Sequence, residues 1–236
     1  MNVAVAVPWR DRGDPTRRGH HDRVHAWFAD ALPGTEVFDV DAPGGKWSLA
    51  AARNAGVRLA HTDVVVVCDA DNVPEHGVLL DAVDACQDDG LVHLPYTLFR
   101  NGTFVWDGSW GGCYVCTPEA WWLAGGQDER FTGWGCEDHA MIYAHSTLLG
   151  HQLVRHDGVL THFPHPAPRE RDPGHPDHVA AGALLRRYEA CAGDVDAMRA
   201  LVAGGGGRDG RQAVEGDATR QADPQQQPEV EEGLLT

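Results

Sequence analysis

The sequence lacks any apolar run that could cross a bilayer. Its longest, around Val64–Cys68, is far shorter than the ~20 residues that a spanning helix needs. The start of the chain, Met1 to Val5, also lacks the basic and apolar regions of a signal peptide. We therefore expect a cytoplasmic protein with no membrane partner.

Basic residues are scarce too. Nineteen Lys and Arg against 35 Asp and Glu give the 236 residues a formal net charge of −16. Phosphate backbones and anionic lipids need clustered cations, so this charge argues against general nucleic-acid or membrane binding. An anionic substrate would have to be held locally by a metal, a few arginines or backbone amides.

Cysteine is sparse: six in a chain of this length do not make a disulfide scaffold, and we expect reduced thiols. Cys113 and Cys116 have the spacing of some zinc and redox sites, but no second such pair exists. They lie in an apolar Cys-Tyr-Val-Cys stretch that is typical of a strand. Core packing is therefore the favoured interpretation of this pair.

What the sequence has is a 42% apolar composition, ordinary for a globular protein, with strand and helix patterns in alternation. Strands are predicted at Asn2–Val7, Glu36–Val40 and Val64–Cys68, and helices at His21–Leu32 and from a Ser48 cap to Ala60. Continuously apolar strands separated by helices favour an α/β fold with a mostly parallel sheet covered on both faces.

The second half of the sequence has shorter patterns. Short strands and turns are predicted over Leu91–Cys116 and Gln152–Leu160, and helices after Thr117-Pro118-Glu119, at Glu137–Leu149 and at Asp177–Leu201. Beyond Ala203 the chain is rich in Gly, Gln, Asp and Glu and poor in apolar residues. We expect one domain over residues 1–202 and a disordered acidic tail over 203–236.

Two carboxylates, Asp69 and Asp71, follow the most apolar strand. Ligands of open α/β sheets bind beyond the carboxyl ends of the strands, and hard oxygen ligands suit Mg²⁺ or Mn²⁺. A cation there could offset the charge on a leaving diphosphate. The alternative is an acidic turn that ends the strand, since Asp favours turns.

A second group of residues combines glycines, tryptophan and acids. Gly111-Gly112 is followed by Gly133-Trp134-Gly135-Cys136-Glu137-Asp138. The glycines allow close approach to a ligand, and Trp134 could form an apolar wall or a stacking platform for a sugar. Of the two acids, one could orient an acceptor while the other abstracts its proton. Alternatively, both simply favour a helix N-terminus.

His162 follows the strand-like Val159-Leu160 and could complete a metal site begun by Asp71. The sequence holds 14 histidines, so a surface or structural role is the alternative for any one of them. The competing candidates are His156, His165, His175 and His178. A zinc-binding module built from them would lack a tight, repeated ligand spacing.

Taken together, these residues resemble the GT-A-fold glycosyltransferases, especially the β-1,4-galactosyltransferase-like group and family 2. The resemblance covers about residues 3–165 and depends on an ordered set of motifs. These are Val7-Pro8-Trp9-Arg10-Asp11-Arg12, Ala52-Arg53-Asn54-Ala55-Gly56, Asp69-Ala70-Asp71-x-x-Pro74, Trp110-Gly111-Gly112, Gly125-Gly126-x-Asp128-Glu129-x-Phe131 and Gly133-Trp134-Gly135-x-Glu137-Asp138. The resemblance implies a Rossmann-like nucleotide-diphospho-sugar transferase fold.

The resemblance also implies a role for each matched position. Asp71 would be the direct metal ligand with His162 completing the site, and Asp69 would lie near the ribose and metal. Glu137 would orient the acceptor, and Asp138 would be the general base. The donor would contact Pro8, Arg10, Arg12, Arg53, Asn54, Trp110, Gly111, Gly112 and Trp134.

Two positions depart from the family pattern. Cys136 stands where a glycine usually precedes Glu-Asp, and His139-Ala140 replaces a further acid common in the galactosyltransferases. The first affects how closely the backbone approaches the donor, and the second weakens any transfer of acceptor specificity. We also expect no membrane anchor or stem of the kind that the Golgi members carry.

The sequence therefore predicts a metal-dependent inverting glycosyltransferase. It would use Mn²⁺ or Mg²⁺ and a nucleotide-diphosphate sugar, with a UDP-sugar as the favoured donor, and transfer the sugar to an acceptor hydroxyl. Nucleic acid would enter only as a modified-base acceptor. Alternatives are a retaining transferase on the same fold, a nucleotidyltransferase, for which no Gly-rich basic loop follows the first strand, and a non-catalytic nucleotide-sugar or glycan-binding protein.

Overall fold

The computed structural model describes residues 1–108 and 110–205, so most of the predicted acidic tail lies outside the described residues. The strands of a six-stranded sheet run in the order β2-β1-β3-β8-β5-β9. They are β1 (Val3–Pro8), β2 (Glu36–Val40), β3 (Val64–Cys68), β5 (His93–Leu94), β8 (Cys113–Cys116) and β9 (Val154–Arg155). The β2, β1 and β3 strands are parallel, and β8 runs antiparallel between β3 and β5.

A second sheet of four strands has the order β4-β10-β6-β7. Its strands are β4 (Asn72–Val73), β6 (Leu98–Asn101), β7 (Phe104–Asp107) and β10 (Val159–His162). The β4 strand pairs antiparallel with β10, and β10 pairs parallel with β6. The fold is thus α/β with a largely parallel central sheet, as the sequence predicted.

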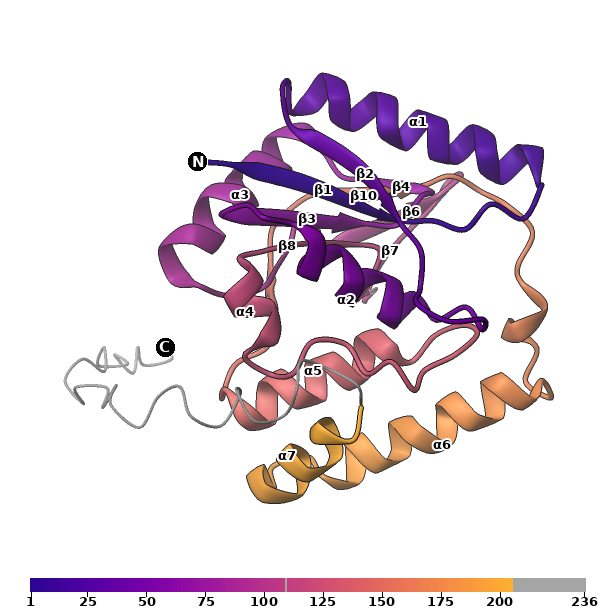
Figure 1. Ribbon diagram of the computed structural model, residues 1–236, viewed down its shortest axis with the longest axis vertical. Coiled ribbons are helices and arrows are strands. Elements are labelled where there is room, and N and C mark those ends of the chain that lie inside the picture. The colour runs from indigo at the N-terminus through magenta and orange to yellow at the C-terminus, as the bar shows by residue number, and fades with distance from the viewer. Residues whose placement is uncertain (109, 206–236) are drawn as a thin grey trace, which may run out of the picture.

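Helices cover both faces of the larger sheet. Figure 1 shows α1 on one side of β1 and β2, and α2 on the other, with α5, α6 and α7 forming a further layer beyond α2. The helices are α1 (Pro15–Ala31), α2 (Leu49–Leu59), α3 (His76–Asp89), α4 (Pro118–Trp122), α5 (Glu137–Leu148), α6 (Pro176–Ala190) and α7 (Val195–Ala203), with a 3₁₀ turn, η1 (Arg169–Arg171).

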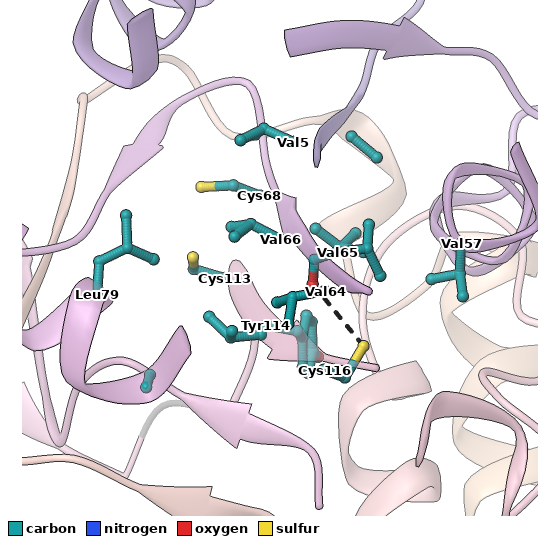
Figure 2. Packing of buried hydrophobic residues seen from close by; sticks show 14 of the residues in the cluster. Val5, Val57, Val64, Val65, Val66, Cys68, Leu79, Cys113, Tyr114 and Cys116 are labelled. Carbon is teal, nitrogen blue, oxygen red and sulfur yellow. Dashed lines mark hydrogen bonds between the residues drawn. The ribbon is translucent and has the colours of Figure 1, made fainter. Parts of the chain in front are cut away.

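The hydrophobic core is built around β3, in which every residue is buried. Figure 2 shows Leu79 of α3 and Val57 of α2 on opposite sides of this strand. Cys113 and Cys116 are fully buried in β8, and the Cys116 thiol lies 3.9 Å from the Val65 carbonyl oxygen. All six cysteines are free, so the core-packing interpretation of the Cys113/Cys116 pair is confirmed.

Two helix boundaries differ from the prediction, and both follow from capping. The first helix begins at Pro15, not His21, because Asp14 caps it by accepting hydrogen bonds from the Thr16 and Arg17 amides. The single closing helix predicted at Asp177–Leu201 is instead α6 and α7. Gly193 adopts φ +81° between them and Asp194 caps the second.

The prediction also omitted α3, whose buried residues occur at helical spacing: Leu79, Ala82, Val83 and Cys86. The helix that follows Thr117 is only five residues long. Within the described ranges, no helix combines the length and the apolar character needed to span a membrane.

Candidate active site

The predicted metal ligands lie where the chain crosses from one sheet to the other. Asp69 directly follows β3 of the larger sheet, and Asp71 directly precedes β4 of the smaller one. The Asp69 amide donates to the Gly112 carbonyl oxygen at 2.8 Å, and the Asp71 carbonyl oxygen accepts from the Phe163 amide at 2.8 Å. Both aspartates are therefore fixed by backbone bonds to segments that follow them by more than 40 residues.

Asp69 belongs to a cluster of charged side chains centred on Arg53 of α2. The Arg53 guanidinium contacts both carboxylate oxygens of Asp69, the closer at 2.9 Å, and donates to Asp138 Oδ1 at 2.7 Å. It also lies 3.5 Å from a carboxylate oxygen of Glu137. Only 1% of the Arg53 side chain is exposed, so one buried cation links the end of β3 to the start of α5.

Asp138, the predicted general base, uses its two oxygens differently. Oδ1 accepts hydrogen bonds from Arg53, from Gln127 at 3.2 Å and from the Tyr114 hydroxyl. Oδ2 faces Gly111: a Cβ placed on that glycine would lie 2.1 Å from it. With Oδ1 committed to three donors, Oδ2 is the oxygen that can take a proton from an acceptor.

The electrostatics separate the two acids at the start of α5. Burial, with the neighbouring Asp138 charge, raises the pKa of Glu137 to about 8 in spite of Arg53. Burial also raises the pKa of Asp69 to about 6, against the opposing effect of Arg53. Glu137 therefore carries a proton at neutral pH and is unsuited to act as a base there.

Asp71 forms a second cluster, with histidines that arrive on and after β10. His165 Nε2 lies 3.0 Å from Asp71 Oδ2 and His162 Nε2 lies 3.9 Å from it. The pairing of His162 with Asn72 in the β10–β4 ladder brings the first histidine there. Ligand atoms of Asp71, His162 and His165 all lie within 4.8 Å of one another, a spacing that suits one metal ion.

These histidines have contrasting electrostatics. Burial lowers the pKa of His162, whereas the hydrogen bond with Asp71 raises that of His165. Burial alone would raise the pKa of Asp71, but the His165 hydrogen bond and the charges of both histidines lower it. His162 Nδ1 is buried without a hydrogen-bond partner in the described structure, which fits a ring kept neutral for a cation.

Gly111 and Gly112 lie between the two clusters, immediately before β8. Gly112 adopts φ +97°, and a Cβ there would lie 2.7 Å from the Asn72 side-chain nitrogen. The Gly111 amide donates a hydrogen bond to the Tyr96 hydroxyl oxygen at 2.8 Å. A side chain at Gly111 would clash with Asp138, and one at Gly112 would clash with Asn72, so both positions favour glycine.

The segment predicted to wrap the nucleotide follows β1. Pro8 is buried, whereas Arg12 is exposed. Arg10 forms a bidentate ion pair with Asp41 at 2.8 and 2.9 Å and donates to three carbonyl oxygens of the loop at 42–45. It therefore joins the loops after β1 and β2, and its contact with a nucleotide stays a prediction.

Asn54, next to Arg53 on α2, is fully buried. Its carbonyl oxygen accepts from the Trp121 indole at 2.9 Å and the Gln127 amide at 3.0 Å. Its amide group donates to the Gln127 carbonyl oxygen and to Glu129. These bonds place Asn54 as a support for the segment that carries Gln127, and its predicted contact with the donor also stays a prediction.

The two predicted tryptophans lie beside arginines. The Arg155 guanidinium lies 4.7 Å from the ring centre of half-buried Trp110, and that of Arg171 lies 4.6 Å from the ring of Trp134, which is 43% exposed. Cys136, the departure from the family pattern, has φ +78° and is the N-cap of α5. Its backbone therefore has a conformation that glycine adopts at less cost.

Three residues of the site were not assigned to it from the sequence. Tyr114 lies within the apolar stretch interpreted as core, and Gln127 occupies the variable position of the Gly-Gly-x-Asp motif. His165 was named only as a competitor of His162. Its spacing of three residues from His162, across Pro164, was the available signal.

Comparisons with known proteins agree with this architecture. Residues 34–147 match the family "Glycosyl transferase family 2". The matched range contains Arg53, both aspartates of the crossing and the two acids of α5. A search of curated protein sequences finds no match to the chain.

Among solved structures, similarity extends to the catalytic domain of Drosophila β1,4-galactosyltransferase 7 in complex with xylobiose (TM-score 0.53, 18% identity, covering 77% of this chain and 79% of that one). A mutant of that enzyme with manganese, UDP-Gal and xylobiose gives TM-score 0.50 at 18% identity, covering 66% and 64%. GalNAc-T7 with UDP, GalNAc and Mn²⁺ gives 0.54 at 12%, covering 85% and 54%.

The chain thus spans less than two thirds of the last two structures. At these identities the similarity to solved structures concerns the fold alone. The family match covers the segment that carries Arg53, Asp69, Asp71, Glu137 and Asp138. Residues 34–147 thus match glycosyl transferase family 2, and the chain has the GT-A fold of the glycosyltransferases to which it is similar.

Proposed function

We propose that this chain is a metal-dependent inverting glycosyltransferase that moves a sugar from a nucleotide-diphosphate donor, a UDP-sugar above all, to an acceptor hydroxyl. The proposal rests on the family match and on one geometric observation. Arg53 holds Asp69 and Asp138 together, at 2.9 and 2.7 Å, beside the crossing that carries Asp71. A candidate donor site and a candidate base thereby share one end of the sheet.

The residues around Asp71 fit a divalent cation, because ligand atoms of one carboxylate and two imidazoles lie within 4.8 Å of one another. Asp71, His162 and His165 would hold it, with Asp69 next along the chain. Mn²⁺ or Mg²⁺ bound there supplies positive charge that offsets the diphosphate. The Drosophila galactosyltransferase structure with manganese and UDP-Gal, and the GalNAc-T7 structure with Mn²⁺ and UDP, support this choice.

Asp138 would take the proton of the acceptor hydroxyl through Oδ2. Its other oxygen is held by Arg53, Gln127 and Tyr114, which fixes the carboxylate in one orientation. Glu137 would orient the acceptor as a hydrogen-bond donor, since its raised pKa keeps it protonated at neutral pH. The hydroxyl oxygen would then attack the anomeric carbon from the face opposite the diphosphate, while the bond from that carbon to the diphosphate oxygen breaks and the nucleoside diphosphate leaves.

The first experiment is a thermal-shift screen of nucleotide sugars with and without Mn²⁺, followed by a transfer assay with the donor that stabilises the chain. Saccharide acceptors are included because the similar Drosophila enzyme was crystallised with xylobiose. Asp138→Asn should reduce transfer by about 10²–10⁴-fold while donor binding stays near that of the wild type. Equal loss of donor binding and transfer would contradict the assignment of the base.

The anomeric configuration of the product, read by NMR, tests the inverting mechanism. A product with the same anomeric configuration as the donor would contradict the inverting mechanism and favour the retaining transferase named as an alternative. A chain that binds a nucleotide sugar with Mn²⁺ but never turns it over would instead be a binding protein. A cytoplasmic location remains part of the proposal and is tested by cell fractionation.

A further inference from the structure

A second group of metal-ligating side chains lies on the other flank of α1, away from the Asp71 cluster. His21 and His25 are one helical turn apart on α1, and Asp39 lies on the neighbouring strand β2. The Nε2 atoms of both histidines lie 2.8 Å from the same oxygen, Asp39 Oδ1. Ligand atoms of the three residues all fall within 4.8 Å of one another.

Both ring nitrogens of His21 face carboxylate oxygens, an environment that favours a positive charge on or beside the ring. Its Nε2 faces Asp39 Oδ1 at 2.8 Å, and its Nδ1 faces Asp22 Oδ1 at 3.0 Å. A neutral imidazole has a single N–H, so one ring nitrogen would point a lone pair at a carboxylate oxygen. Either a second proton or a metal cation resolves that contact. With Nδ1–H donated to Asp22, Nε2 becomes free to ligate a metal, an arrangement usual for metal-binding histidines.

We propose that His21, His25 and Asp39 form a zinc site that fastens α1 to β2. Two imidazole nitrogens and one carboxylate oxygen are a ligand set that suits a borderline cation such as Zn²⁺. Zinc–ligand bonds of ~2.0–2.2 Å in a tetrahedron place the ligand atoms roughly 3.3 Å apart. The 2.8 Å contacts of the two histidines with Asp39 would therefore have to lengthen by only about half an ångström on zinc binding.

The site is also accessible. The His21 side chain is 8% exposed, but those of His25 and Asp39 are 28% and 42% exposed. A hydrated cation can therefore reach the open side and keep water as its fourth ligand. On the buried side, the Trp9 ring stacks on His21 with 4.6 Å between ring centres, which fixes the orientation of the imidazole.

This site is separate from the proposed catalytic one but shares α1 with it. The preceding residue, His20, points the other way, with its ring 5.5 Å from Phe163 and 6.3 Å from His165. The helix thus lies between the two clusters and directly follows the loop at 9–14. Zinc bound between α1 and β2 would fix the position of α1, the helix that borders both the zinc cluster and the Asp71 cluster.

The experiment counts bound metal with Zn²⁺ alone, by isothermal titration calorimetry of the chelator-treated chain at pH 7.5. The Asp71 cluster is first silenced by Asp71→Ala, His162→Ala and His165→Ala in one variant. We expect this variant to bind one equivalent of Zn²⁺, and expect that equivalent to disappear when His25→Ala is added. The matched control is His61→Ala, which removes an exposed histidine before β3 and should change nothing.

Two further measurements keep the proposal falsifiable if the triple variant fails to fold. His25→Ala alone should lower the Zn²⁺ count of the otherwise unaltered chain by one, and Asp22→Asn should weaken that equivalent about tenfold. Co²⁺ at the site should give the visible absorption of a tetrahedral nitrogen–oxygen complex, lost in His25→Ala. No Zn²⁺ binding in the silenced variant, or binding that His25→Ala leaves unchanged, would overturn the proposal. None of these readouts depends on sugar transfer.

Discussion

Asp69 and Asp71 are two residues apart, yet their carboxylates belong to different clusters. Asp69 is paired with a fully buried arginine, while Asp71 lies against two half-buried histidines. A turn separates them: Ala70 and Asp71 leave the line of β3, and the Asn72 amide donates back to the Asp69 carbonyl oxygen at 3.1 Å. One short acidic motif therefore serves both an internal ion-pair network and a group of metal-ligating side chains.

The difference shows that the Asp-x-Asp spacing does not by itself assign a metal ligand. Asp69 already has a cation as its neighbour, and that cation also contacts Asp138. Asp71 has no arginine or lysine at ion-pair distance among the described residues, but it has ligands that accept a metal. We therefore expect substitutions in the arginine cluster to change folding, and those in the histidine cluster to change metal binding.

The largest expected effect is in the arginine cluster. Arg53→Met keeps the bulk of the side chain but leaves Asp69, Glu137 and Asp138 without their shared cation. Removal of one partner from a buried ion pair costs about 3–5 kcal/mol, which urea denaturation should show as a loss in the free energy of unfolding. The control is Arg58→Met on the same helix, where the pair with Glu129 is 36% and 22% exposed and should cost less than about 1 kcal/mol. Equal losses in both variants would contradict the central role of Arg53.

The next effect belongs to the histidine cluster. Mn²⁺ at 100 times its dissociation constant should stabilise the wild type by about 2.7 kcal/mol, because only the folded chain presents the ligands together. Asp71→Ala should abolish this gain, and removal of the metal with a chelator should reverse it in the wild type. Asp138→Asn should retain the gain, since Asp138 belongs to the other cluster. Thermal unfolding with and without Mn²⁺ measures all three, and a gain that survives Asp71→Ala would place the metal elsewhere.

A smaller effect is expected where the two clusters meet. Gly111→Ala would put a methyl group 2.1 Å from Asp138 Oδ2, the oxygen assigned to proton transfer. Overpacking of this kind costs typically 1–3 kcal/mol, and we expect sugar transfer to fall further than stability because the carboxylate must move. Gly174→Ala is the control, since a Cβ there meets nothing within 4 Å. Stability is measured by urea denaturation and transfer by initial rates; transfer at the wild-type level would show that Oδ2 is not needed.

Much of the fold could be predicted from the sequence because β1, β2, β3 and α2 carry their own signals. The Val64–Cys68 strand is buried along its whole length, and Ser48 caps α2 through the Ala51 amide. The starts of α1 and α7 were missed because they depend on caps, at Asp14 and Asp194, rather than on apolar periodicity. The first turn of α1, with Thr16, Arg17 and Arg18, is polar, so apolar periodicity does not mark its start.

The site was only partly predictable for a different reason. Acids and glycines at strand ends could be named, but their partners depend on pairing between distant segments. The β10–β4 register brings His162 beside Asp71, and β8 places Tyr114 under Asp138. Neither pairing leaves a local mark in the sequence, so Tyr114 was assigned to the core and His165 was ranked below His162.

The smallest effect concerns how the free energy of unfolding depends on pH. The raised pKa of Glu137 and the lowered pKa of Asp71 change it in opposite directions. The folded chain keeps the Glu137 proton up to a pKa of about 8, whereas the unfolded chain loses it near the ordinary value of 4.5. The folded state thus binds more protons between these values, and its stability is complete below the lower one and falls as pH rises through the higher one. One proton changes the free energy of unfolding by at most about 1.4 kcal/mol per pH unit.

Glu137→Gln should therefore flatten the fall in stability between pH 6.5 and 8, a range above the pKa of about 6 of Asp69. Glu36→Gln, on the exposed side of β2, is the matched control and should keep the wild-type slope. The lowered pKa of Asp71 acts in the opposite direction and only in acid, because its stabilisation is present above the ordinary value and is lost as pH falls. Urea denaturation at each pH measures the slopes. If Glu137→Gln and Glu36→Gln have the same slope, Glu137 is ionised in the folded chain and cannot serve as the protonated partner of the acceptor.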